Sequence, residues 1–344
     1  MRAFRRWLLV STLCGVVASA PMLKAEDATA LLTRLQAATA ANSLDDASLT
    51  PWHLKVSYQL FDNKGKPGES GTMEEWWSSP TLYKLSFTSP SYTSTEIHNQ
   101  DGVFFTNGAR KPYMLTMLQE LMLHPMPQEW MLAHATPKLK KEKFGKQKVE
   151  LDCIALEPSH FPEMSVGSFR TYCLDDMNRL RLSYDANTLE AGRNTLGTFQ
   201  QRIVAVDLLV AANGMNLLTA HVTALQTDPS DAAEFIPTPE MSKESGPRAL
   251  HVGSAVVAGR KVGGPPPEYP PAARQSHKQG SVLLSAIIGT DGHIHDLQVI
   301  SDPDDDLSAA AEKAVQQWVY KPYLLNGVPT EVETTITVNF RMGY

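Results

Sequence analysis

The sequence has few cysteines and lacks the motifs that usually mark catalytic and metal-binding sites. It has only three cysteines among 344 residues, and two would remain after export, which are too few for an ordinary zinc site. It contains no Gly-x-Ser-x-Gly elbow, no His-Glu-x-x-His motif and no phosphate-binding P-loop. We therefore expect no enzyme activity, no cofactor and no metal site.

Basic residues are also in the minority. The chain has 31 lysines and arginines against 37 aspartates and glutamates, a net charge of −6. Binding to the phosphates of nucleic acid requires a basic surface, so we expect no nucleic-acid partner. One basic run, six lysines between residues 138 and 148, is predicted to be a solvated hairpin tip. The alternative is a contact with anionic lipid or an acidic partner.

The N-terminus lacks an apolar run of the length that spans a membrane. Three arginines in the first six residues precede an apolar stretch from Trp7 to about Ala20, whereas a span needs about 20 apolar residues. This pattern is typical of a secretory signal peptide. The best cleavage site follows Ala25, which predicts a signal peptide over residues 1–25 and a mature chain with 27 basic and 37 acidic residues. The alternative is an uncleaved leader that anchors the protein in the inner membrane.

Residues 26–236 have the pattern of an antiparallel β domain. A helix is predicted over 28–41, and short alternating segments separated by turn residues follow between Trp52 and Leu225. Strands of this length and spacing indicate antiparallel sheet, with about ten strands in a curved, half-open barrel. One helix, Tyr113 to Leu123, is expected to lie over the sheet.

That helix is unusually rich in methionine and leucine. Flexible methionine side chains suit an adaptable apolar surface, so the helix is either a core element or the lid of an apolar ligand site. The candidate lid residues are Met114, Met117, Leu118, Leu121 and Met122.

Cys153 and Cys173 are the two cysteines expected after export. Each lies in a segment with a strand pattern, and an even pair in an oxidising compartment suggests a disulfide. We predict that they are bonded, with two buried free thiols as the alternative.

A second, smaller domain is predicted over 247–344, after a linker at 237–246 that is rich in proline and charge. Two alternating strands flank Asp291-Gly292, a pair that suits a hairpin turn. An apolar stripe from Leu307 to Trp318 predicts a helix, and alternation up to Phe340 predicts a last strand. The whole chain is therefore expected to be α+β, with a three-stranded antiparallel sheet and one packed helix in its second domain.

The order of motifs in this second domain resembles the C-terminal domain of the TonB family of periplasmic energy transducers. The residues that carry the resemblance are Tyr269-Pro270, Gly280-Ser-Val282, Asp291-Gly292, Trp318-Val-Tyr320-Lys-Pro322 and Asn326-Gly327. The resemblance implies a periplasmic location and an outer-membrane transporter, or another envelope protein, as the partner. It also implies that the partner supplies a short extended peptide that pairs strand to strand.

A weaker resemblance covers part of the first domain. Gly71-Thr-Met-Glu-Glu-Trp76-Trp77-Ser-Ser-Pro80, Tyr83-Lys84 and Asp101-Gly102 are similar to segments of the bacterial lipoprotein carriers and their outer-membrane receptors. This resemblance implies a lipid or lipoprotein as a second possible partner, with the TonB-like domain as a docking handle.

The candidate partner-binding residues lie at the end of the chain. The last strand, residues 331–341, is expected to be a free edge with Thr335, Thr337 and Asn339 on a solvated face, and an exposed edge recruits further strands. Tyr269 and Pro270 are added from the resemblance. A homodimer that closes this edge is the alternative. Because the linker is short, we expect an interaction module rather than a full energy transducer.

Overall fold

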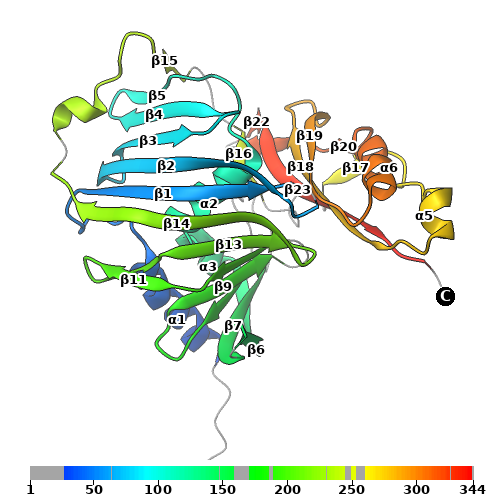
Figure 1. Cartoon of the computed structure of the whole chain (residues 1–344), viewed down its shortest axis with the longest axis horizontal. Helices are drawn as coiled ribbons and strands as arrows, with labels where there is room; N and C mark the ends of the chain where they lie inside the picture. The colour runs from blue at the N-terminus through cyan, green and yellow to red at the C-terminus, as the bar shows by residue number, and fades with distance from the viewer. Residues whose placement is uncertain are drawn as a thin grey trace, which may run out of the picture.

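The computed structural model describes residues 27–342 except 63, 147, 159–169, 186–188, 230, 245–248, 253–259 and 326. It is an α+β protein in which a large antiparallel sheet domain precedes a smaller sheet with a packed helix (Figure 1). No helix in the described part is both long and apolar enough to cross a membrane. The predicted signal peptide lies outside the described residues.

The N-terminal domain is built on one curved sheet of 13 strands in the order β15-β5-β4-β3-β2-β1-β14-β13-β10-β9-β8-β7-β6 (Figure 1). Buried and partly exposed residues alternate along β1, so one face of the sheet belongs to the core. A separate hairpin joins β11 (Leu196–Phe199) to β12 (Arg202–Ala205). The sheet strands are β1 (Trp52–Phe61), β2 (Pro67–Ser79), β3 (Leu82–Thr88), β4 (Thr93–Asn99), β5 (Gly102–Phe105), β6 (Ala135–Phe144), β7 (Val149–Pro158), β8 (Arg170–Leu174), β9 (Leu180–Asp185), β10 (Glu190–Arg193), β13 (Asp207–Ala212), β14 (Met215–Thr227) and β15 (Ser242–Lys243).

Three helices cover one face of this sheet: α1 (Ala28–Asn42), α2 (Tyr113–Leu123) and α3 (Glu129–Ala133) (Figure 1). α1 and α2 form where the sequence predicts helices. Apolar residues of α2 pack with those of β1, β2 and β3 in the largest hydrophobic cluster. α1 packs over β7, β8 and β9 in a second cluster.

The basic run, which comprises six lysines between residues 138 and 148, forms more than the predicted hairpin tip. Most of it forms β6, which the sequence did not predict as a strand, and β6 is the last strand at one edge of the sheet. Its lysines pair with acids on the same hairpin, as in Lys138 with Glu157 at 2.6 Å and Lys141 with Glu150 at 2.7 Å. Exposed lysines discourage other strands from adding to an edge. The run therefore protects the sheet, and only residues near Gly145 form the predicted tip.

The C-terminal domain has a sheet in the order β16-β23-β18-β19. The helix α6 (Asp305–Val315) packs on one face, with Leu307, Ala311 and Val315 buried against the sheet. Its start is capped by Asp304, whose side chain accepts a hydrogen bond from the amide of Asp306. η1 (Ala232–Phe235) comes just before the linker and contacts β3 and β4 of the large sheet. The remaining elements of the C-terminal domain are β16 (Leu250–His251), β17 (Lys261–Gly263), α5 (Pro271–Gln275), β18 (Gly280–Ile288), β19 (Ile294–Ser301), β20 (Val319–Tyr320), β21 (Tyr323–Leu325), β22 (Val328–Thr330) and β23 (Val332–Phe340).

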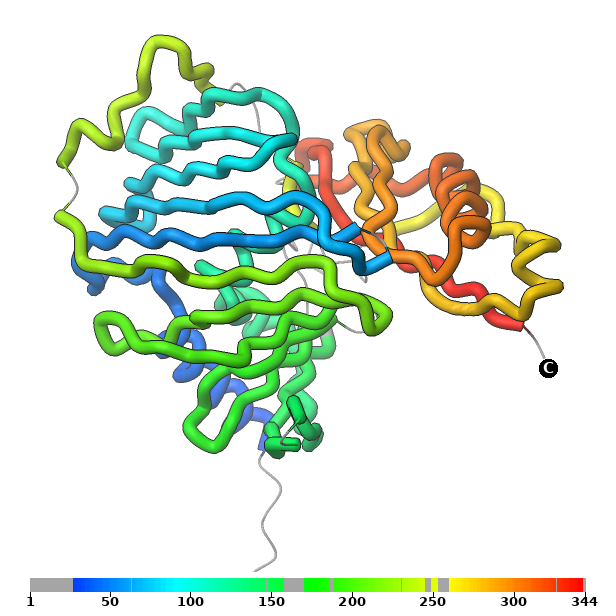
Figure 2. Tube along the Cα trace, viewed as in Figure 1, coloured from blue at the N-terminus to red at the C-terminus, as the bar shows by residue number. Residues whose placement is uncertain are grey.

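The two domains are joined by more than the predicted linker. Within that linker, Ser242 and Lys243 form β15 and pair with β5 of the large sheet, so the chain follows the sheet edge before it enters the second domain (Figure 2). Leu283 and Ile300 of the C-terminal sheet join the hydrophobic cluster of the N-terminal domain. Arg110 adds ion pairs across the junction, at 3.1 Å to Asp296 and 2.6 Å to Glu333.

Candidate partner-binding edge of the C-terminal domain

The outer edge of β23 exposes the backbone of alternate residues. The carbonyl oxygens of Glu331 and Glu333 accept hydrogen bonds from Leu250 and Val252, so the backbone groups of these odd-numbered residues point away from β18. The β18–β23 register has no bulge, and alternation along a strand repeats every two residues. The N–H and C=O groups of Thr335, Thr337 and Asn339 therefore point to the same outer side.

The edge is shorter than the sequence predicts. The short strand β16 pairs in parallel with Val332 and Glu333, so β23 is not the terminal strand of the sheet. Val252, which follows β16, is fully buried in the domain core, which makes β16 part of the fold. The expectation of a wholly free last strand is wrong for its first residues. Beyond Glu333, no strand of the described chain pairs with this side of β23.

The predicted solvated face of β23 is also mostly covered. Thr335 is only 4% exposed, Thr337 is partly buried, and Asn339 alone is exposed. Thr337 lies opposite Leu283 in the β18–β23 register, and Leu283 packs into the N-terminal domain. The prediction failed because contact with another domain, rather than water, covers this face. Any partner contact by Thr335 and Thr337 would be made through their backbone groups.

Tyr269 and Pro270 lie where the chain enters the C-terminal fold. The Tyr269 ring meets Phe340 edge-to-face with centroids 5.6 Å apart, and its hydroxyl donates a hydrogen bond to the carbonyl of Lys278. Pro270 stands immediately before α5. These contacts hold the segment on the end of β23. The predicted role of the two residues in partner binding stays a prediction.

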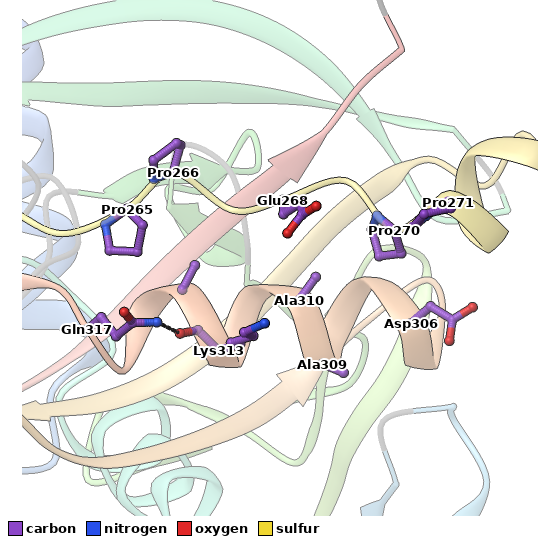
Figure 3. Close-up of a pocket in the computed structure, with 11 residues that line it drawn as sticks. Pro265, Pro266, Glu268, Pro270, Pro271, Asp306, Ala309, Ala310, Lys313 and Gln317 are labelled. Atoms are coloured by element: carbon purple, nitrogen blue, oxygen red, sulfur yellow. Dashed lines mark hydrogen bonds between the residues drawn. The ribbon is translucent and has the colours of Figure 1, made fainter.

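Pro270 also lines a groove between the proline-rich segment 265–271 and α6 (Figure 3). The groove has a volume of about 480 Å³, and small side chains of α6, including Ala309 and Ala310, form its helical side. Sequence reasoning did not identify it, because the extended segment and the helix are separated along the chain.

The helix α2 is packed as a core element. Four of the five candidate lid residues, Met117, Leu118, Leu121 and Met122, are at most 5% exposed, and Met114 packs against the same cluster. A cavity that Leu121 and Met122 help to line has a volume of only about 10 Å³. A lid function would require α2 to move away from the sheet.

Two buried arginines, Arg170 of β8 and Arg193 of β10, bind α2. Arg193 donates a hydrogen bond to the carbonyl of Leu121 at 3.1 Å, and Arg170 lies 3.3 Å from the carboxylate of Glu120. Burial, and then the nearby charge of Arg170, lowers the pKa of Arg193 to about 9. Sequence reasoning did not find these arginines, because neither stands in a recognisable motif.

The predicted disulfide is confirmed. Cys153 of β7 and Cys173 of β8 lie directly opposite each other and are bonded. Both are fully buried, in a small cluster with Leu151.

Residues 265–342 match a family model. It describes the C-terminal domain of the TonB protein of Gram-negative bacteria. Two curated proteins, both named Protein TonB, from Xanthomonas campestris pv. campestris strains B100 and ATCC 33913, are 32% identical over 79 residues. The match covers 23% of this chain and 35% of each relative, so the chain spans about a third of their length. The predicted resemblance of the second domain to the TonB family is confirmed.

The N-terminal part is similar to solved structures at low identity. A putative outer membrane lipoprotein-sorting protein domain from Vibrio parahaemolyticus has 11% identity and a TM-score of 0.40, and covers 59% of this chain and 95% of its own. A LolA superfamily protein from Nitrosomonas europaea has 7% identity and a TM-score of 0.41, with coverages of 60% and 96%. A DUF1329 family protein from Desulfovibrio piger has 8% identity and a TM-score of 0.42, with coverages of 61% and 98%. At these scores the likeness supports no functional conclusion.

Proposed function

We propose that the protein is a periplasmic interaction module that binds an extended segment of an outer-membrane transporter or another envelope protein. The observation that carries the proposal is the outer edge of β23, where Thr335, Thr337 and Asn339 present backbone donors and acceptors in a row. An extended peptide adds to such an edge through main-chain hydrogen bonds. The match of residues 265–342 to the TonB C-terminal domain supports the same class of partner.

The length of the edge limits the affinity. β16 already uses Val332 and Glu333, and β23 ends at Phe340. A partner strand therefore has about four to six main-chain hydrogen bonds to make, each worth about 0.5–1.5 kcal/mol net. After the cost of ordering the peptide, such a contact favours weak, reversible binding.

Removing one outward donor tests the proposal. The variant Thr337→Pro lacks the backbone N–H at the centre of the edge, whereas Thr337→Val keeps that N–H and loses only a hydroxyl. We expect fluorescence anisotropy with extended peptides from outer-membrane transporters to show weaker binding to Thr337→Pro. Binding to Thr337→Val should match the wild type, and circular dichroism should confirm that both variants are folded.

The binding results for the two variants distinguish three interpretations of the β23 edge. Unchanged affinity in a folded Thr337→Pro variant would place the peptide elsewhere. Equal weakening in both variants would point to the side chain rather than the backbone. If light scattering shows a dimer that Thr337→Pro dissociates, the edge serves a second copy of this chain instead.

Carriage of a lipid or lipoprotein is the second candidate function. The methionine-rich helix α2 covers one face of the curved sheet, but its apolar side is packed and the small cavity there, about 10 Å³, admits no acyl chain. Mass spectrometry of the protein purified from envelopes without detergent is the direct test. A bound acyl lipid would favour this function, and a lipid-free protein would oppose it.

A further inference from the structure

The tip of the β6–β7 hairpin carries three lysines that have no acidic partner. The lysines before residue 142 form ion pairs with acids of the same hairpin. Lys143, Lys146 and Lys148, the tip lysines, are exposed and form no ion pair within the described chain. A Cβ placed on Gly145, at the turn, would meet nothing within 4 Å, so the tip projects into open space.

Two exposed apolar side chains lie beside the tip lysines. Val149, where β7 begins, is 46% exposed, and Met177, in the turn between β8 and β9, is 60% exposed. The β7–β8 register, continued past Asp152, brings Met177 level with Val149. Arg34 joins the two segments, because it donates hydrogen bonds to both Asp152 and Asn178. This corner of the domain therefore combines unpaired positive charge with apolar groups.

The charge of this corner is opposite in sign to that of the whole chain. The chain has a net charge of −6. Among the exposed residues of the tip and of the neighbouring turn, the three tip lysines stand against one unpaired acid, Asp176. Salt screens exposed charges over about 8 Å under physiological conditions, so a surface that meets the tip responds to these local charges and not to acids elsewhere on the chain.

A bilayer with anionic phospholipid complements both features. Its negative surface potential attracts lysines, and exposed apolar side chains are accommodated at the boundary between head groups and acyl chains. Val149 and Met177 favour the bilayer over an acidic protein, which would complement only the lysines. The hairpin also lies at the end of the large sheet opposite β15, away from the C-terminal domain (Figure 1).

We propose that the tip of the β6–β7 hairpin binds the surface of a bilayer that contains anionic phospholipid. The tip lysines meet the phosphate groups, and Val149 and Met177 enter the boundary region. The proposal does not depend on strand addition at β23, because none of these residues lies in the C-terminal domain.

Vesicle sedimentation tests the proposal with the exported chain, produced from Glu26 onwards so that the apolar leader cannot itself bind lipid. The protein should bind vesicles of phosphatidylethanolamine and phosphatidylglycerol about tenfold more tightly than vesicles of phosphatidylcholine, which carry no net charge. Raising the salt from about 0.1 M to about 1 M should remove most of this preference. Equal binding to the two kinds of vesicle would overturn the proposal. So would binding to neither, which would leave an acidic protein as the partner of the tip lysines.

A triple variant locates the contact. Changing all three tip lysines to glutamine should weaken binding by about tenfold or more, since each lysine near an anionic surface contributes about fivefold. The matched control changes three exposed lysines elsewhere to glutamine: Lys66, Lys313 and Lys321. It alters the net charge equally and should weaken binding by no more than about twofold. Equal weakening by both variants would show that only net charge acts, and would overturn the assignment.

A dye on Met177→Cys reports the apolar contact. The two cysteines of the exported chain are bonded to each other, so the new thiol is the one that reacts with the dye. Emission from an environment-sensitive dye should shift to the blue when anionic vesicles are added. The same dye on Val262→Cys, an exposed apolar position in the C-terminal domain, should not shift. Circular dichroism checks that the variants fold. Unchanged emission from Met177→Cys in a protein that sediments with vesicles would overturn this placement of the contact.

Discussion

The hairpin turn between β18 and β19 provides a sharp test of how the C-terminal domain is held together. Gly292 has a φ of +81°, and a Cβ placed there would lie 2.0 Å from the carbonyl oxygen of Tyr320. The same glycine accepts a hydrogen bond from the amide of Tyr320 at 2.9 Å. Alanine at this position therefore meets both an unfavourable backbone conformation and a clash with rigid backbone.

The chain supplies a matched control for the first of these effects. Gly327 has a φ of +80°, and a Cβ there would meet nothing within 4 Å. Gly327→Ala should cost only the left-handed conformation, about 1–2 kcal/mol. Gly292→Ala should cost that amount and in addition displace β20, with loss of a hydrogen bond worth about 0.5–1.5 kcal/mol and of local packing. We expect its total cost to be about twice that of the control.

Differential scanning calorimetry of the wild type and the two variants measures the difference. Gly292→Ala should lower the melting temperature clearly more than Gly327→Ala. If the two variants lose the same stability, the close approach of the turn to β20 does not contribute, and the argument from the clash is refuted.

Three further predictions concern stability and processing. Burial, and then the nearby charge of Asp45, raises the pKa of Glu75 from 4.5 to about 8. Between these pH values the folded protein binds more protons than the unfolded chain. The free energy of unfolding therefore falls as the pH rises from about 4.5 to 8. Glu75→Gln should flatten that fall in urea titrations at several pH values, and an unaltered pH profile would show that Glu75 is not its source. Replacing Cys153 and Cys173 together by alanine opens a loop with a sequence separation of 20 and should cost about 3 kcal/mol, with urea denaturation as the measurement and an unchanged midpoint as the contrary result. Cleavage after Ala25 predicts Glu26 as the first residue of the exported protein, and N-terminal sequencing that begins at Met1 would support the anchored alternative.

Local pattern was enough to predict several elements. The Asp291-Gly292 turn, the strands beside it and the helix α6 follow from residues close together in sequence, and the structure places all of them within a few residues of the prediction. The disulfide was predictable because only two of the three cysteines lie beyond the predicted signal peptide. The strand signals of the N-terminal domain likewise predicted an antiparallel sheet, although with fewer strands than the 13 that pair.

Contacts between distant segments could not be read from pattern. β16 is only two residues long, and it leads into Val252, which is buried in the core of the C-terminal domain. The threonines of β23 look solvated in sequence, but Thr335 is covered at the junction of the domains. The sequence analysis did not predict strand β6, because its lysines suit an exposed strand at the edge of the sheet. The sequence does not show the order of strands in the sheet, and so it does not show which strand lies at the edge.

The pairing of both ends of the connecting segment makes the link between the domains a very short tether. β15 and the hydrogen bond from the amide of Glu244 to the carbonyl of Val103 fix the chain to the large sheet, and β16 fixes Leu250 to the small one. Six residue steps from Glu244 to Leu250 reach at most about 20 Å. At such a reach the effective concentration of one domain at the other is high, in the millimolar range typical of short linkers. A junction of modest affinity is then closed nearly all the time. If it opens, it recloses far faster than a separate partner at micromolar concentration could enter.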